Sequence, residues 1–486
     1  RGRPIDIAQL PTDDATTYEM MQKADTIGVF QIESRAQMAT LPRMKPTCFY
    51  DVVIEVAIIR PGPIQGHLMH PYLARRQGKE EVSYYGDEER LKPVLERTLG
   101  VPLFQEQMLK IAMVMADFTG SEAEELRRAL SFHRSEERMN KVKAKLELAM
   151  QRKGFEPQII QQVIDAIGSF ALYGFPESHA ISFAILAYAS AYLKVHRAVE
   201  FYASLLNNQP MGFYSPATIV KDARRHGVHF KPVDVTISDW NYKIESDDTL
   251  RIGLRAVEGL RHVQAEYLLE QRAKRPFENL EDFKRRARLH KDELRTLAEV
   301  GALNAFADHR RAALWEVEES LVGDDDLFFA VDRTSSVEIL QNGRTPLPHM
   351  TDVERLAADY SGLSLTIGPH PMTFLRPHLR NVWRAVDLPN GQHGQIIRIA
   401  GNVICRQRPG TAKGFVFISL EDETGVSNAI VAPQLFEKLR LTITQESFLL
   451  IEGRLQTTDG VYVIQARHIE RLDHGQLQGA ASYDFH

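Results

Sequence analysis

The sequence contains only two cysteines in 486 residues, Cys48 and Cys405, and they lie far apart along the chain. This number excludes a disulfide framework and is too small for a cysteine-built zinc site, so we expect a reducing compartment, the cytoplasm. Runs of about 18 apolar residues, the length that a bilayer span needs, are also missing, which argues against a membrane role. Arg1 opens a charged, proline-containing stretch without an initiator methionine or an apolar signal segment, from which we expect an internal start.

A surplus of positive charge is missing too. The formal net charge is −5 and the pI is near 6.4, so no overall positive field favours nucleic acid, and any such binding must come from local patches. The chain has two dense basic runs, which comprise Lys284, Arg285, Arg286, Arg288, His290 and Lys291, and Arg127, Arg128, His133 and Arg134. A solvated helix face is the competing explanation for either run, and composition alone favours it.

Length and patterning predict several domains. The composition is globular, with 44% hydrophobic and 25% charged residues, and at roughly 150 residues per domain the chain should hold about three. We predict a multidomain protein that is mainly α, with tandem helix-hairpin-helix units and a C-terminal all-β OB-fold. The predicted boundaries are a helical region at 1–205, the hairpins at 206–320, a linker and helical connector at 321–390, the OB-fold at 391–475 and a tail at 476–486.

The first region reads as helices broken by ordered turns. Apolar residues recur at spacings of three and four in 108–115 and 186–193, which is typical of buried helix faces. The sequences RPGP at 60–63 and GFP at 174–176 cannot continue a helix, because proline fixes its own φ and pushes the preceding residue towards extended backbone.

Two helical hairpins follow in the second region. Residues 252–260 lead into a helix at 263–272, and a second unit runs from 289 to 303 with a glycine turn at 300–303. Glycines in such turns let backbone N–H groups approach a phosphate at a helix N-terminus without reading bases. The candidate DNA-binding residues are Gly259, Arg261, Lys284, Arg285, Arg286, Arg288, Lys291 and Gly301. A hairpin used only for packing is the alternative. Arg261 stands where many hairpins carry a second glycine, which weakens the phosphate contact but adds a charge.

The last region switches to the period of two that strands show. Alternation at 397–403 is followed by strand candidates at 415–420, 427–431, 447–454 and 461–466, with a short helix at 433–439. Five strands and one intervening helix describe an OB-fold, whose face binds single strands by aromatic stacking and a basic groove. The candidates for such contacts are Phe415, Phe417, Arg406, Arg408 and Lys413. We expect that at least one of the two phenylalanines instead fills the barrel core.

The motifs of the chain resemble, in order and over nearly its full length, those of the DnaE-type bacterial replicative polymerases, the alpha subunit of DNA polymerase III. They are GVFQIESR at 28–35, RPGP at 60–63, FQEQ at 104–107, LRRA at 126–129 and YGFPESHA at 173–180. Pro176 and Glu177 stand where replicative members usually carry Asn-Lys, and residues 406–415 look like the error-prone, damage-induced branch called ImuC. The resemblance implies template-directed DNA synthesis past lesions in damage-induced mutagenesis.

The resemblance also implies what the helical region at 1–205 does. It corresponds to the polymerase fingers, and Arg127 and Arg128 resemble the paired arginines near the incoming dNTP, a task that suits bidentate, permanently charged guanidinium groups. Tyr173 and His179 border the turn that should face the forming base pair, with a packed hinge as the alternative. Arg60 and Arg35 are secondary nucleotide-binding candidates.

The catalytic centre itself is expected to lie elsewhere. Polymerization needs two cations, here Mg²⁺, clamped by aspartates, and in this family these sit in a palm domain that should precede this stretch. The acidic residues at 247–248 and 324–326 lie in polar, turn-like contexts. We therefore expect a C-terminal fragment that lacks the palm, assign it no catalytic or metal-binding residue, and predict that alone it is inactive.

Partners follow from the same resemblance. The expected ligand is primer–template DNA. A sliding-clamp motif needs a glutamine with a Leu-Phe pair, and residues 324–328 (DDDLF) lack the glutamine. We expect weak or no direct clamp contact and recruitment through an accessory Y-family-like polymerase partner. A non-catalytic DNA-binding or scaffold protein of the replication or repair machinery, built from the same domains, is the alternative function.

Overall fold

The structure is a computed structural model that describes residues 5–59, 71–131, 136–171, 175–318 and 347–484, except 474, 476, 478 and 483. The chain forms two compact units. The first comprises residues 1–196 with the short pieces 410–413 and 459–461, and the second comprises the remaining residues from 197 onwards.

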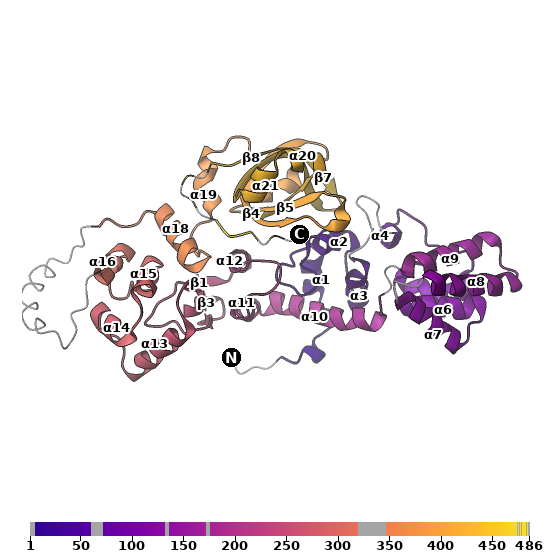
Figure 1. The fold of residues 1–486 in the computed structure, drawn as a ribbon, viewed down its shortest axis with the longest axis horizontal. Helices are drawn as coiled ribbons and strands as arrows, with labels where there is room; N and C mark the ends of the chain where they lie inside the picture. The colour runs from indigo at the N-terminus through magenta and orange to yellow at the C-terminus, as the bar shows by residue number, and fades with distance from the viewer. Residues whose placement is uncertain are drawn as a thin grey trace, which may run out of the picture. The chain divides into compact units, whose positions relative to one another are not determined.

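The first unit is helical. Its helices are α1 (Ala15–Gln22), α2 (Arg35–Met44), α3 (Phe49–Ile58), α4 (Pro71–Arg76), α5 (Glu88–Leu95), α6 (Gln105–Ala116), α7 (Gly120–Ser131), α8 (Glu136–Arg152), α9 (Pro157–Ala171) and α10 (Glu177–His196). The long helix α10 packs on α1 and α3 (Figure 1), while α5 to α9 enclose a separate core that includes Leu91, Leu126 and Met150. Short polar residues start these helices: the Asp14 carboxylate accepts from the Thr17 amide, and Ser34 caps α2 in the same way, as N-cap residues do.

The second unit begins with α11 (Ala198–Asn207) and α12 (Pro216–Arg225). A small sheet follows, in the order β1 (His229–Lys231), β3 (Thr249–Arg251), β2 (Lys243–Ile244). The hairpin region then contains α13 (His262–Lys274), α14 (Leu280–Ala287), α15 (Lys291–Glu299) and α16 (Arg310–Glu318), and the connector contains α18 (Asp352–Leu363) and α19 (Pro371–Leu375). The 3₁₀ turn Leu254–Ala256 precedes α13. Helices therefore occupy both places where the sequence predicts hairpins.

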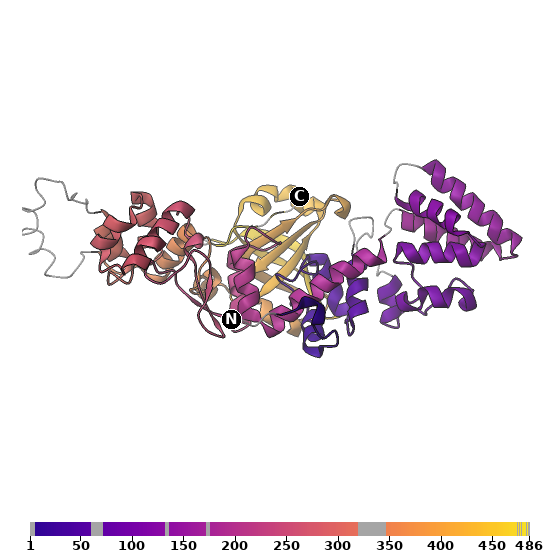
Figure 2. The ribbon, with the colours of Figure 1, turned by 90° about the horizontal axis from the view of Figure 1, so that it is seen from below.

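The C-terminal part is a closed five-stranded barrel (Figure 2). The strands are β4 (Ile396–Gln407), β5 (Val416–Glu421), β6 (Val426–Val431), β7 (Phe448–Thr458) and β8 (Val461–Arg471), with α20 (Pro433–Lys438) and α21 (Arg440–Gln445) between β6 and β7. The barrel order is β4-β5-β6-β8-β7, and β4 pairs with both β5 and β7 in antiparallel register. The predicted fold class, mainly α with a C-terminal OB-fold, is confirmed.

The expectation that Phe415 or Phe417 fills the barrel is wrong. On β5 the residues that point inward are Val416, Ile418 and Leu420, all within the barrel core. Successive side chains of a strand point to opposite faces, so Phe417 lies on the outer face, and both phenylalanines are half-buried. The sequence shows the alternation but not which of its two phases faces inward.

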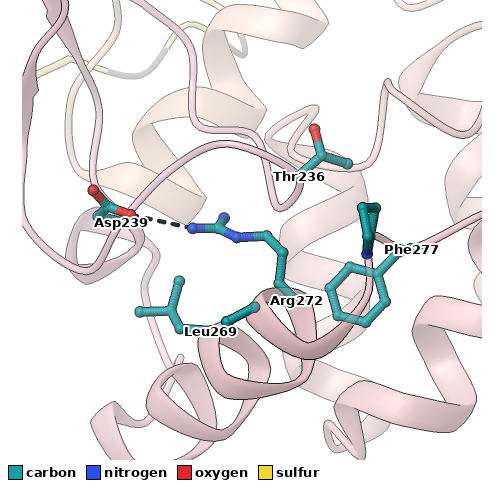
Figure 3. Close-up of a pocket in the computed structure, with 7 residues that line it drawn as sticks. Thr236, Asp239, Leu269, Arg272 and Phe277 are labelled. Atoms are coloured by element: carbon teal, nitrogen blue, oxygen red, sulfur yellow. Dashed lines mark hydrogen bonds and ion pairs between the residues drawn. The ribbon is translucent and has the colours of Figure 1, made fainter.

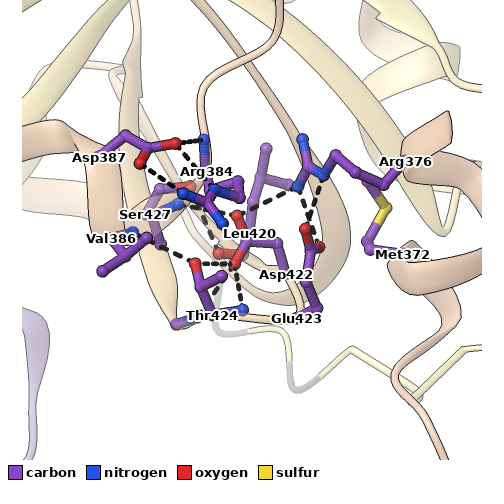
Figure 4. Close-up of polar contacts among 12 residues, drawn as sticks. Met372, Arg376, Arg384, Val386, Asp387, Leu420, Asp422, Glu423, Thr424 and Ser427 are labelled. Atoms are coloured by element: carbon purple, nitrogen blue, oxygen red, sulfur yellow. Dashed lines mark hydrogen bonds and ion pairs between the residues drawn. The ribbon is translucent and has the colours of Figure 1, made fainter. Parts of the chain in front are cut away.

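Ionic contacts join the barrel to the helices that precede it within the second unit. The Arg376 guanidinium contacts Asp422 and Glu423 at the end of β5, and Asp422 also accepts from the Ala385 amide (Figure 4). On α12, Arg225 donates to the buried Glu421 carboxylate at 2.8 Å. The barrel is thus held by charged groups that are themselves largely removed from water.

Within the described part of the chain, no helix combines the length and the apolar character that crossing a membrane requires.

Candidate nucleic-acid interface

The turn before α13 is open to solvent. Gly259 has φ +77°, which favours glycine, and a Cβ built there would meet no atom within 4 Å. Helix α13 begins at His262 without a side-chain cap, so its first amides are not used inside the helix. Among the described residues, no hydrogen-bond acceptor is found for the amide of Gly259 or for those of residues 262–264. Four N–H donors therefore gather at an exposed helix N-terminus, where an anion is favoured.

Arg261 fixes this turn to the second hairpin. Its guanidinium and its amide both donate to Glu293, the guanidinium Nε at 3.0 Å, and Glu293 also accepts from the His290 amide at the start of α15. Burial alone would raise the pKa of Glu293, but the hydrogen bonds from Arg261 and His290 hold it below its usual value. The Arg261 side chain is still 53% exposed, so one cation both braces the turn and faces solvent.

The second predicted turn is closed. The Gly301 amide donates to the Ala298 carbonyl at 3.0 Å. A Cβ at Gly301 would lie 2.8 Å from Nε of Arg310, which shows how tightly this turn is packed. The structure therefore gives Gly301 a packing position and not a place in an open phosphate-binding turn.

The basic run on α14 divides into internal and exposed groups. Lys284 is 8% exposed and donates to the Glu316 carbonyl at 2.7 Å. Arg286 donates to the carbonyls of Gln271, Arg275 and Pro276, at the end of α13 and just beyond it. Both are structural cations, contrary to the prediction of a single basic surface. Because the N–H donors of Lys284 and Arg286 are used by carbonyl groups inside the fold, few remain to bind a phosphate.

The other members of the run lie on the surface. Arg285 is 53% exposed, at 3.8 Å from Asp282, and Lys291 is 51% exposed, at 2.9 Å from Glu318. Arg288 ends α14 at φ +52° with its guanidinium 5.9 Å from the Tyr267 ring centroid. These ion pairs are of the exposed kind that contributes little to stability, so a phosphate can replace the carboxylate partner at small cost.

A pocket beside the first hairpin does not extend this surface. It is lined by Thr236, Asp239, Leu269, Arg272, Ala273, Pro276 and Phe277 (Figure 3). The Arg272 guanidinium in it donates to the carbonyls of Val235 and Ser238 and to the Asp239 carboxylate. Since the cation is committed to the protein, the pocket does not favour an anion.

On the OB-fold the predicted cations also differ. Arg406 is 11% exposed, and its guanidinium contacts the Ile443 and Glu446 carbonyls and Asp484, which makes it a structural residue. Arg408 is 42% exposed, with its guanidinium 4.6 Å from the Phe436 ring centroid. Lys413 is exposed. On the outer face of the barrel, Phe417 is paired with Gln407 on β4 and with Ile430 on β6. The sequence pattern does not indicate these neighbours.

In the first unit, Arg127 and Arg128 lie on the exposed side of α7. Their side chains are 46% and 68% exposed and share the Glu124 carboxylate. The hydrogen bond from Arg127, with further contributions from Arg128, lowers the pKa of Glu124 to about 2. Arg35 is the first residue of α2 and is half-buried. Two further nucleotide-binding candidates, Arg60 and Tyr173, lie outside the described residues.

His179 is exposed on the first turns of α10. Its ring centroid lies 5.1 Å from that of Phe175 and 4.3 Å from that of Phe183. The start of α10 is well anchored, because the Phe175 carbonyl accepts from the Gln105 amide and Tyr50 donates to Glu177. The predicted nucleotide-binding histidine is thus part of an aromatic surface, which the spacing 175, 179 and 183 on a helix could have indicated.

The fold and these surfaces define a multidomain nucleic-acid-binding protein. Three family models match it: the bacterial DNA polymerase III alpha subunit finger domain at residues 1–154, the helix-hairpin-helix motif at 227–313 and the OB-fold nucleic acid binding domain at 394–472. The chain is thus similar to DnaE-type bacterial DNA polymerases, and the relatives given below are named error-prone DNA polymerases.

Those relatives match along the whole chain. The error-prone DNA polymerase of Alkalilimnicola ehrlichii is 45% identical over 498 residues, which cover 100% of this chain and 47% of the relative. The error-prone DNA polymerase of Bordetella bronchiseptica is 44% identical with the same coverage, and error-prone DNA polymerase 2 of Agrobacterium fabrum is 43% identical, with 45% of its length covered. The chain thus spans about half the length of the curated relatives it matches.

Proposed function

We propose that this chain holds primer–template DNA and the incoming dNTP for an error-prone DNA polymerase that synthesizes DNA past lesions. The observation that carries the DNA-holding role is the open turn at Gly259, where four amides without protein acceptors among the described residues precede or begin α13. Arg261, Arg285, Arg288 and Lys291 add exposed cations in the same hairpin region. Such contacts hold the sugar–phosphate backbone and are independent of sequence, as a polymerase requires.

The nucleotide role rests on α7 and α10. Arg127 and Arg128 point away from the core and share one carboxylate, Glu124, so a triphosphate can compete for both guanidinium groups. His179 presents its ring at the start of α10. We propose that these residues bind the dNTP, with Arg35 as a secondary contact.

The adjacent aspartates Asp247 and Asp248 do not fit a Mg²⁺ centre. Asp248 accepts from Ser246 and Thr249 in an exposed turn, whereas two-cation catalysis needs carboxylates that converge on a shaped cavity. We therefore propose that this chain binds and positions primer–template DNA and the incoming dNTP. Recruitment by an accessory Y-family-like partner, with weak or no clamp contact, remains part of the proposal, and residues 324–328 lie outside the described residues.

The decisive experiment compares two glycines. Gly259→Ala places a methyl group over the proposed phosphate site, whereas Gly227→Ala adds the same group at φ +79°, also with no atom within 4 Å. Both cost similar backbone strain. We expect only Gly259→Ala to weaken binding of a labelled primer–template and to flatten its dependence on salt by about one phosphate contact. Equal effects of the two variants, or binding by the wild type that does not respond to salt, would contradict the proposal.

A further inference from the structure

An aromatic row lies on the surface of the first unit, and it comprises Phe175, His179, Phe183 and Phe30. Three of its members lie along α10 or just before it, and the ring centroids of Phe183 and Phe30 are 5.4 Å apart. Phe30 is 39% exposed, and Leu186, three residues after Phe183, is 47% exposed. Contiguous apolar surface of this kind on a protein marks a binding site more often than isolated exposed residues do.

The backbone holds Phe30 in this exposed position. Val29 and Ile32 on either side are fully buried, and the Phe30 amide donates to the Ser190 hydroxyl of α10 at 3.2 Å. The turn is closed by the Ile32 amide, which donates to the Phe30 carbonyl at 2.8 Å, with Gln31 at φ +65°. Because the backbone on both sides is anchored in this way, the Phe30 side chain points to the surface.

The length of the row decides between one nucleotide and a strand. The four rings follow one another at centroid distances of 5.1, 4.3 and 5.4 Å, so the row spans at most about 15 Å from Phe175 to Phe30. Successive bases of one strand rise by only about 3.4 Å. The base of a single dNTP at His179 would reach the neighbouring rings but leave Phe30 uncovered, whereas consecutive unpaired bases would cover the whole row.

We propose that the aromatic row binds unpaired bases of the template strand by stacking. The inference rests on the proposed function, because the row includes His179, to which the dNTP role is given, and continues from it to Phe183 and Phe30. Rings offer every base a π-face, so such contacts tolerate any template sequence. The tilted arrangement of the rings, with interplanar angles of 39° to 59°, leaves edges and faces available to bases of a strand that passes over them.

The test measures the part of binding that depends on bases. A labelled oligothymidylate and an abasic strand of equal length carry the same phosphates, so the ratio of their affinities isolates stacking. We expect the chain to prefer the oligothymidylate, and Phe30→Leu with Phe183→Leu to lower that preference about tenfold. Phe30→Leu alone, at a half-exposed position, should lower it in part and keeps the test valid if the double variant does not fold, which circular dichroism would show.

Matched controls separate this row from other sites. Ile185→Ala alters a residue that is 43% exposed on the same helix but two positions from Phe183, and so on another face; it should leave the preference intact. Phe417→Leu removes one stacking candidate of the OB-fold without touching the row. A preference unchanged in the Phe30 and Phe183 variants, or equal wild-type affinity for both strands, as expected if a protein covers the row, would overturn the proposal. Duplex binding through Gly259 is measured separately, so either idea can fail alone.

Discussion

At the scale of single residues, Glu55 is a buried carboxyl group that belongs to none of the proposed binding surfaces. It lies in the middle of α3, its side chain is fully buried, and neither carboxylate oxygen has a hydrogen-bond partner among the described residues. Burial raises its pKa well above the usual value. A buried polar group without a partner costs stability in the charged form.

Replacing this carboxyl group should therefore stabilise the protein in a pH-dependent way. Because the folded-state pKa is raised, the folded state binds the proton more tightly, and stability is lost as pH rises above the unfolded value of about 4.5. We expect Glu55→Gln to raise the free energy of unfolding by about 1–3 kcal/mol at pH 8 and to have little effect near pH 4. Urea denaturation at both pH values measures this, and a gain that is the same at both would refute it.

At the scale of elements, α14 shows that neighbouring arginines have different tasks. Arg286 is 15% exposed and satisfies carbonyl groups at the end of α13, as a C-terminal cap does, whereas Arg285 is 53% exposed and faces solvent. A helix of eight residues thus presents one cation to the protein and the next to its surroundings.

A pair of substitutions on α14 should separate stability from DNA binding. Arg286→Ala removes the guanidinium donor from the carbonyls of Gln271, Arg275 and Pro276, of which, among the described residues, only Gln271 keeps a second donor, the Arg275 amide. We expect it to lower the free energy of unfolding by about 2–3 kcal/mol. Arg285→Ala should change stability by less than about 0.5 kcal/mol but weaken duplex binding and its salt dependence. Chemical denaturation and a salt series on both variants would show this, and the reverse assignment of effects would refute the division.

Much of this element structure could be predicted from sequence, because periodicity survives without tertiary context. The helices α6, α10 and α13 and all five barrel strands follow apolar spacing. The roles of single side chains could not be predicted, because they depend on contacts between residues that only the folded chain brings together. The basic run does not reveal that Lys284 and Arg286 meet carbonyls from distant residues, and the alternation in β5 does not reveal that Phe417 lies outside the barrel. The exposed Phe30 depends on the burial of Val29 and Ile32, which only the fold shows.

At the scale of the second unit, one buried carboxylate joins the barrel to the helices. Glu421 on β5 is 2% exposed in its side chain, lies 2.8 Å from Arg225 of α12, and has His370 at 3.8 Å. Burial would raise the pKa of Glu421, but His370 and Arg225 lower it below the usual value. An ion pair this deeply buried is costly to break, because one charge is left without its partner.

Removing that charge should loosen the barrel from α12. We expect Glu421→Gln to lower the free energy of unfolding by about 3 kcal/mol at pH 7. Since the folded-state pKa is depressed, this contribution is present above about pH 4.5 and is lost as pH falls through the folded value, so the two proteins should converge in acid. Glu437→Gln, at a carboxylate that is 61% exposed, is the control and should change little. Calorimetry that finds equal effects for the two variants would contradict this assignment.

The strand order of the barrel also fixes when it can form during synthesis. The first strand, β4, pairs with β7, and β6 pairs with β8, the last strand of all. A ribosome must therefore release nearly the whole barrel sequence before its first strand finds both neighbours, whereas the α-helical hairpins need only nearby residues. A message cut short between α19 and β8 would yield a chain with formed hairpins and no barrel at all, rather than a barrel that is slightly too small.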